Sequence, residues 1–222
     1  FPPSPDCKEV TIYGSLEPAK EVGGDLYDFH IQNGHLLFCV GDVSGKGVPA
    51  SLMMAVTRSL FRTVSYQTEQ PDEIMKRIND SLSEMNENLL FVTFFVGILD
   101  LKTGHLSYSN AGHCAPVIIG SSLSTLKMDT NIPLGVMSGW DYTKQECHID
   151  PGSIIFLYTD GLTEAQDAVY NQFGEERMMA ELEKMGSATP RELIDHMSAE
   201  IHRFENGTEQ SDDLTMLAIK YT

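Results

Sequence analysis

The order of apolar segments constrains this chain of 222 residues more than any other feature of its sequence. Strand-like runs come in neighbouring groups and helix-like runs come in pairs, so the two kinds of segment do not alternate one by one. One-by-one alternation builds parallel sheets, whereas grouped strands joined by short turns build antiparallel ones. The order therefore predicts an α+β fold, arranged as a four-layer αββα sandwich of two antiparallel sheets flanked by helix pairs.

The expected strands are runs rich in β-branched and aromatic residues that lie between turn signals. Asn33-Gly34 falls inside one such run, and this dipeptide is a strong signal for a two-residue hairpin. The expected strands cover residues 9–16, 25–40 with the hairpin inside it, 91–101, 105–110, 115–119, 142–149, 153–159 and 214–221.

The expected helices carry apolar residues at every third or fourth position. They cover residues 48–66, 71–88, 174–185 and 190–204. In the first helix, the spacing predicts an apolar stripe and core methionines at Val48, Leu52, Met53, Met54, Val56, Leu60 and Val64. In the second helix, it predicts a buried face made of Ile74, Ile78, Leu82 and Met85.

The charge balance narrows the classes of partner. The sequence has 15 Lys and Arg against 32 Asp and Glu, a formal net charge of −17. Such a chain repels phosphate backbones and anionic lipid, which argues against nucleic-acid binding and against membrane contact by this domain. Acidity also favours solubility, and that accounts for most of the surface carboxylates.

The cysteines and the chain start bear on location and domain boundaries. Four cysteines form neither a disulfide framework nor a zinc spacing, and no apolar run reaches the length of a membrane span. A cytoplasmic location is expected, although the full-length protein could be membrane-anchored. The proline-rich residues 1–8 are expected to end an upstream linker, and residues 9–222 to form one domain.

Aspartates stand where apolar strands begin or end, at Asp25, Asp42, Asp160 and the pair Asp212-Asp213. Aspartate is disfavoured inside strands, and any one of these residues could simply cap a turn. Several such positions together favour another interpretation. If antiparallel sheets bring these strand ends together, the carboxylates repel one another unless their pKa values rise or cations neutralise them.

Carboxylate oxygens are hard ligands, which select Mg²⁺ or Mn²⁺ (or Ca²⁺) over zinc or copper. Several carboxylates can hold two such cations about 3.5–4 Å apart, an arrangement used for phosphoryl chemistry. The pattern therefore predicts a site for two divalent cations.

Five short motifs follow one another along the chain. They are EVGGDLYD (21–28), GDVSGKG (41–47), NAGH (110–113), YTDGLTEA (158–165) and DDLT (212–215). In this order they resemble the PPM family of metal-dependent protein phosphatases, and most of all its bacterial SpoIIE/RsbU-like branch. The resemblance covers nearly the whole chain. It implies the αββα sandwich and a site for two ions of Mn²⁺ or Mg²⁺.

The resemblance also implies a set of ligands, matched position by position. Asp42 would bridge the two ions, and the carbonyl of Val43 would bind one of them. Asp160 and Asp212 would hold the other ion, while Asp25 would reach the site directly or through water.

Two secondary candidates accompany this set. Asp213 is adjacent to Asp212 and could substitute for it in part. Animal members of the wider family hold phosphate with an arginine near the N-terminus, and no arginine precedes Asp25 here. Lys20 is the nearest cation and a hypothetical phosphate ligand, although a solvated surface lysine is the simpler interpretation.

The implied activity is hydrolysis of phosphoserine or phosphothreonine by in-line attack of a metal-bound water, without a phosphoenzyme. The implied partners are a phosphorylated protein substrate, typically a STAS-fold anti-anti-sigma protein of bacterial sigma factor regulation, and an upstream sensor or receiver domain in the full-length chain. A homodimer formed through the upstream linker is also consistent with the resemblance.

Three further residues are set aside. A general-acid role for His113 is considered, but a lone histidine in such a turn is more often structural. Asp28 lies three residues from Asp25, so a regular strand puts the two on opposite faces, and Asp28 is expected to be structural. Lys46 sits in a glycine-rich loop that lacks the spacing and the Ser or Thr of a P-loop.

Two other classes of protein compete with a phosphatase. A pseudophosphatase would use the same fold to bind a partner, but such a protein is expected to lose metal aspartates. Here Asp25, Asp42, Asp160 and Asp212 are all present. A metal-dependent phosphodiesterase or nuclease could use similar carboxylates, but the net charge of −17 and the lack of a basic groove argue against it.

Overall fold

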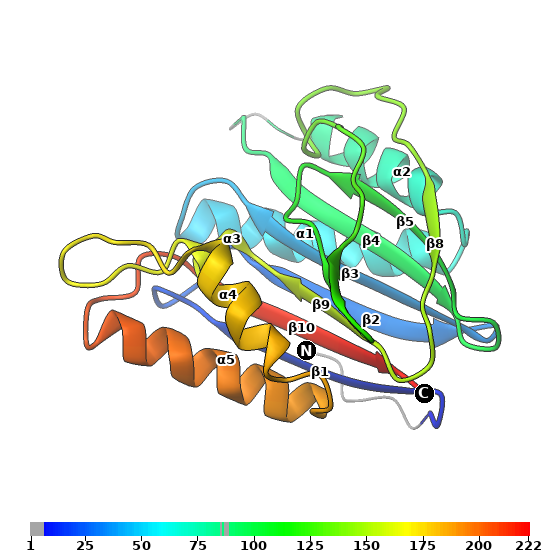
Figure 1. Ribbon diagram of the computed structural model, residues 1–222. Coiled ribbons are helices and arrows are strands. Elements are labelled where there is room, and N and C mark those ends of the chain that lie inside the picture. The colour runs from blue at the N-terminus through cyan, green and yellow to red at the C-terminus, as the bar shows by residue number, and fades with distance from the viewer. Residues whose placement is uncertain (1–6, 85, 87–88) are drawn as a thin grey trace. The chain divides into compact units, whose positions relative to one another are not determined.

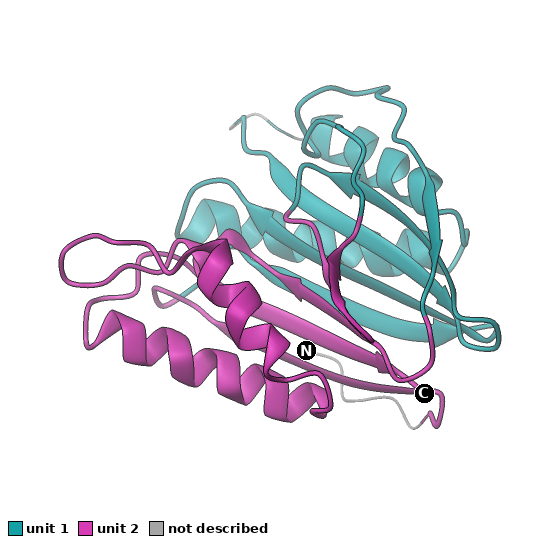
Figure 2. Cartoon of the chain, viewed as in Figure 1, with its two compact units in different colours: residues 1–3, 22–113, 127–149 teal, residues 4–21, 114–126, 150–222 magenta. Residues whose placement is uncertain are grey.

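The computed structural model describes residues 7–84, 86 and 89–222. The chain forms two compact units, which Figure 2 shows in teal and magenta. In the described part, unit 1 contains residues 22–113 and 127–149, and unit 2 contains residues 7–21, 114–126 and 150–222. Each unit has one five-stranded antiparallel sheet and its own helices, which confirms the α+β class.

The sheet of unit 1 has the strand order β2-β3-β4-β5-β8. Its strands are β2 (Leu26–Gln32), β3 (His35–Val43), β4 (Val92–Asp100), β5 (His105–Ala111) and β8 (Gln145–His148). The predicted hairpin joins β2 to β3, with φ angles of 49° at Asn33 and 81° at Gly34. Residues 36–40 of β3 are all fully buried, which explains why this stretch of the strand is apolar at every position and does not alternate.

Helices α1 (Val48–Ser65) and α2 (Pro71–Glu84) pack on one face of this sheet (Figure 1). The predicted inner face of α2 is confirmed for Ile74, Ile78 and Leu82. The fourth predicted member, Met85, lies outside the described residues. Met53 and Met54 of α1 pack half-buried against the same core, as predicted.

The predicted apolar stripe of α1 is wrong in its first half. Val48 and Leu52 are each 64% exposed, and Val56 is also exposed. The residues of α1 that are buried are Ala50, Thr57, Phe61, Val64 and Ser65.

Asp28 of β2 explains this orientation of α1. Its carboxylate is fully buried and accepts hydrogen bonds from Arg58 Nε (3.0 Å) and from Arg62 through Nε (2.8 Å) and Nη2. A buried carboxylate requires partners, so α1 is oriented with both arginines reaching β2 and with Val48 and Leu52 on the side away from the sheet. These contacts are consistent with the structural role predicted for Asp28.

The sheet of unit 2 has the strand order β1-β10-β9-β6-β7. Its strands are β1 (Val10–Glu17), β6 (Val117–Ile119), β7 (Leu123–Thr125), β9 (Ile154–Tyr158) and β10 (Leu214–Tyr221). The inner strand β10 pairs with β1 over the whole length of both strands. It pairs with β9 on its other side.

The described part of unit 2 has three helices: α3 (Asp160–Thr163), α4 (Gly174–Glu183) and α5 (Pro190–Glu205). Leu182, Leu193, Met197 and others from α4 and α5 pack in one core with side chains of β9 and β10. A capping box between Thr189 and Glu192 starts α5, as sequence rules for helix starts require.

Most predicted elements appear within a few residues of their expected bounds. The short elements β7 and α3, of three and four residues, were not predicted. Residues 1–6 of the predicted linker lie outside the described residues. Among the helices of the described ranges, none is both long and apolar enough to cross a bilayer.

Candidate metal centre

The strand pair β2–β3 brings Asp25 beside Asp42. The last paired residues are Leu26 and Gly41, so one further step of the antiparallel register sets Asp25 opposite Asp42. Residues directly opposite in such a pair have Cβ atoms roughly 4.5–5.5 Å apart. Asp25 is only 2% exposed, and Asp42 is half-buried. Two carboxylates at neighbouring positions repel each other, and a bound cation would relieve that repulsion.

Gly24 shapes the space next to this pair. A Cβ added at Gly24 would lie 3.1 Å from the carbonyl oxygen of Val43 and 3.4 Å from the Cβ of Ala50. Ser51 of α1 donates a hydrogen bond of 2.8 Å to the carbonyl of Gly23, which fixes the turn before β2. The glycine therefore keeps side-chain atoms away from the Val43 carbonyl, the backbone group predicted to bind a metal.

Thr93 of β4 lies opposite Asp42 on the other side of β3, and its hydroxyl is 3.0 Å from Nδ1 of His113. Asn110 closes the turn that holds His113: its Nδ2 donates to the His113 carbonyl (2.9 Å) and its Oδ1 accepts from the His113 N–H (3.1 Å). His113 is buried in this network, which agrees with a structural role. Sequence reasoning missed Thr93, because only strand register reveals it as a neighbour of Asp42.

The second acidic pair lies where β9 and β10 meet. Asp160 begins α3, two residues after the end of β9, and Asp212 lies two residues before β10. Gly161, next to Asp160, packs on the turn at Asp212 and Asp213. A Cβ added at Gly161 would lie 2.0 Å from the carbonyl oxygen of Asp213 and 3.5 Å from the Cβ of Asp212. Only glycine fits there, and the contact holds the two acidic turns of unit 2 against each other.

The two adjacent aspartates differ in their contacts. Asp213 is buried, and its Oδ1 accepts a hydrogen bond of 2.8 Å from the N–H of Ala19. Asp212 is half-buried, and its Oδ1 accepts from the N–H of Asp213 (2.9 Å). Asp213 thus anchors the segment after β1, which supports the preference for Asp212 as ligand. Lys20 is exposed and follows Ala19, so it lies beside this acidic turn.

The donors present suit a hard divalent cation. Every predicted ligand is a carboxylate or a carbonyl oxygen, and no thiol or imidazole belongs to the set. Burial raises the pKa of Tyr158, two residues before Asp160, so this phenol stays neutral and adds no charge. Asp25 and Asp42 belong to unit 1 and Asp160 and Asp212 to unit 2. The meeting of the two pairs at one site stays a prediction.

In the described part of the chain, the group with three potential metal ligands within 4.8 Å of one another is not made of the predicted aspartates: it joins Glu181 of α4 with His196 and Glu200 of α5. Glu181 binds Lys184 Nζ at 2.6 Å and His196 Nε2 at 2.9 Å, and Glu200 pairs with Arg203. Ion pairs therefore account for this group, which the sequence did not predict.

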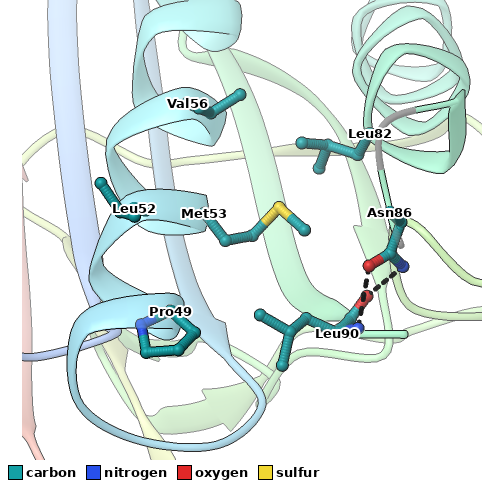
Figure 3. A pocket seen from close by; sticks show the side chains of 7 residues that line it. All are labelled: Pro49, Leu52, Met53, Val56, Leu82, Asn86 and Leu90. Atoms are coloured by element: carbon teal, nitrogen blue, oxygen red, sulfur yellow. Dashed lines mark hydrogen bonds between the residues drawn. The ribbon is translucent and has the colours of Figure 1, made fainter. Parts of the chain in front are cut away.

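Figure 3 shows a pocket of unit 1 at α1 and α2, where Met53 points between the helices. Asn86 closes one end, donating from Nδ2 to the carbonyl of Leu90 and accepting from the Leu90 N–H at 2.9 Å. The pocket is otherwise lined by Pro49, Leu52, Val56 and Leu82. It offers no carboxylate, so it does not fit a hard cation.

Comparison with known proteins identifies the family. Residues 32–222 match the family described as Stage II sporulation protein E (SpoIIE). The chain belongs to the SpoIIE family. This finding confirms the resemblance that the five motifs indicated.

Two curated relatives match almost the whole chain. Protein IcfG of Synechocystis sp. is 32% identical over 97% of this chain, and phosphoserine phosphatase RsbU of Bacillus subtilis is 24% identical over 96% of it. The chain spans 38% of the length of IcfG and 64% of the length of RsbU.

Solved structures share the SpoIIE-family fold. The SiaA-PP2C domain of Pseudomonas aeruginosa has a TM-score of 0.85 at 22% identity, covering 95% of this chain and 86% of that one. The RsbU and RsbW domains of Rv1364c from Mycobacterium tuberculosis give 0.80 at 27% identity, covering 96% and 60%. RsbX in complex with magnesium gives 0.75 at 16% identity, covering 99% of both chains.

Proposed function

We propose that this chain is a metal-dependent protein serine/threonine phosphatase domain. The observation that carries the proposal is the presence of two acidic pairs at strand ends, Asp25 with Asp42 and Asp160 with Asp212. Beside each pair, a glycine packs closely against a neighbouring backbone carbonyl. The SpoIIE family and the RsbU relative, named a phosphoserine phosphatase, support it. The magnesium complex of RsbX supports a hard divalent cation.

The proposed ligands are those that the motifs implied. Asp42 and the Val43 carbonyl come from the end of β3, and Asp25 lies across from them. Asp160 and Asp212 supply the second pair. Asp213 is a secondary candidate, because its carboxylate already accepts a hydrogen bond from the N–H of Ala19.

Two ions of Mn²⁺ or Mg²⁺, when bound, would supply an activated water and neutralise charge on the phosphoryl group. The protein's part is to hold carboxylates at fixed separations, so that little reorganisation accompanies hydrolysis. Half-buried Thr93 and buried His113 support the strand end that carries Asp42. Lys20, exposed beside the Asp213 turn, is a candidate to contact phosphate.

The proposed substrate is a serine- or threonine-phosphorylated regulatory protein of the STAS type, acting in bacterial sigma factor regulation. The relatives IcfG and RsbU are longer than this chain. This is consistent with an upstream sensor or receiver domain in the full-length protein and with dimerisation through the linker before the domain. A cytoplasmic location of the domain is part of the proposal.

Hydrolysis of p-nitrophenyl phosphate with Mn²⁺ tests the proposed function. Activity should vanish with a chelator, and Asp42→Asn or Asp160→Asn should each lower kcat by about 100-fold or more, because each removes a charged ligand. Asp195→Asn is the matched control, since this aspartate of α5 is exposed and lies in a surface pair with Arg191.

Wild-type turnover in Asp42→Asn or Asp160→Asn would contradict the assignment of that residue. Tight Mn²⁺ binding without any hydrolysis would instead favour the second candidate, a pseudophosphatase that uses the fold to bind a partner.

A further inference from the structure

The loop between α3 and α4 exposes two large apolar side chains. Val169 is 72% exposed and Tyr170 is 83% exposed, and they are adjacent at the tip of the loop. Single exposed apolar residues are ordinary on protein surfaces. An exposed valine beside an exposed tyrosine at the tip of one loop is less common.

The loop is closed by hydrogen bonds. The carboxylate of Asp167 accepts from the N–H of Val169 (3.0 Å), from the N–H of Asn171 (2.9 Å) and from Asn171 Nδ2 (2.8 Å). At its base, Phe173 N–H donates to the carbonyl of Ala165 (2.9 Å), and both of these side chains are buried. The tip is therefore presented on a fixed frame, and the charge of Asp167 is satisfied inside the loop.

Tyr170 has a left-handed backbone, with φ of 65°. Glycine and asparagine adopt this region at low cost, and a tyrosine is strained there. The side chain gains no burial in return. Strain that persists without a packing benefit points to a role in function rather than in stability.

The loop starts beside the proposed metal ligands of unit 2. It follows α3, a single turn about 6 Å long whose first residue is Asp160. Figure 1 shows the loop in yellow leaving the end of α3, at the same end of unit 2 as the red-orange connection from α5 to β10. That connection carries Asp212, which Gly161 holds close to α3. A protein whose phosphoryl group lies at Asp160 is therefore within reach of the tip.

We infer that Val169 and Tyr170 dock the protein substrate, so that they select a phosphorylated STAS-type protein over a small phosphate ester. This inference rests on the proposed function. Tyrosine is enriched at binding hot spots because it offers a large apolar ring and a hydroxyl with few rotatable bonds. The two side chains carry no charge on a chain of net charge −17, so they offer a phosphoprotein an apolar contact on an otherwise acidic surface. The matching surface is an apolar patch beside the phosphoserine.

The test is the double variant Val169→Ser/Tyr170→Asn, assayed on two substrates with Mn²⁺. Asparagine tolerates the backbone angle at position 170, so the loop should keep its shape and Tm should not fall. We expect kcat/KM for a serine-phosphorylated STAS-domain protein to fall by about 10-fold or more, mainly through KM. Turnover of p-nitrophenyl phosphate should change by less than about 2-fold, because no ligand of the metals is altered.

Tyr66→Ser is the matched control, since Tyr66 is an exposed tyrosine at the end of α1 in unit 1. It should leave both substrates unaffected. Equal loss on both substrates in the double variant, or loss only in the control, would overturn the inference while leaving the proposed phosphatase in place.

Three other outcomes are distinguishable: two count against docking, and one counts against the proposed function. If the wild type hydrolyses p-nitrophenyl phosphate but no phosphorylated STAS-domain protein, the substrate and the docking role are both wrong. If sedimentation shows a wild-type dimer that the double variant loses, the tip binds a second copy of the chain. If the wild type hydrolyses neither substrate, the proposed function itself fails.

Discussion

At the scale of single residues, glycines decide whether the acidic side chains can approach one another. The contact of Gly161 with the Asp213 carbonyl leaves no room for a side chain, and Gly24 leaves little beside Val43. The sequence showed glycines next to the aspartates and predicted close approach of the backbone. It could not show which backbone each glycine meets, because that depends on the register of strands far apart in the chain.

Replacing Gly161 tests this contact. Gly161→Ala forces a Cβ against a backbone oxygen, so we expect a loss of about 3 kcal/mol in the free energy of unfolding, at the upper end for overpacked sites. For a chain of this size that corresponds to a fall in Tm of roughly 6–12 °C, measured by calorimetry. Gly186→Ala is the matched control, because an added Cβ there meets nothing within 4 Å. Equal Tm values for the two variants would show that the turn moves aside without cost.

At the scale of elements, the type of each long segment was predictable and the orientation of α1 was not. The hairpin at Asn33-Gly34 and the helix starts at Pro71 and Pro190 follow from local rules. The apolar spacing of Val48 and Leu52 suggested an inner face, yet both lie outside. The deciding contact joins Asp28 to arginines 30 and 34 residues later, and such a pairing leaves no periodic signal in the sequence.

The ion cluster at Asp28 should therefore contribute to stability. Arg62→Met removes the bidentate partner of a fully buried carboxylate. We expect a loss of about 2–3 kcal/mol in the free energy of unfolding. This is less than the usual cost of breaking a wholly buried pair, because Arg62 is partly exposed. Arg77→Met breaks an exposed pair with Glu73 on α2 and should cost less than about 0.5 kcal/mol. Urea titrations of both variants measure the difference. Equal losses would mean that Asp28 finds other partners and does not orient α1.

At the scale of the whole molecule, the family and the α+β class were predictable from the sequence. The order of the five motifs indicated the family, and the order of apolar segments indicated the class. The site was predictable only as a set of aspartates, since their pairing depends on how strands align. Within each unit the structure supports that pairing: the β2–β3 register ends one residue before Asp25 and Asp42, and Gly161, next to Asp160, packs on the turn at Asp212 and Asp213. Whether the two pairs act as one site is a question for metal binding by the whole chain.

Thermal unfolding with Mn²⁺ answers it without relying on activity. A cation that binds only the folded chain stabilises it by about 2.7 kcal/mol at 100 times its Kd, which corresponds to a rise in Tm of roughly 5–10 °C. Sodium chloride at equal ionic strength is the control, because screening alone also eases repulsion in a chain of net charge −17. If the pairs form one site, Asp42→Asn and Asp160→Asn should each remove most of the Mn²⁺ effect. A shift that survives undiminished in either variant would mean that the ions bind at one pair alone, and the two-ion site would then be wrong.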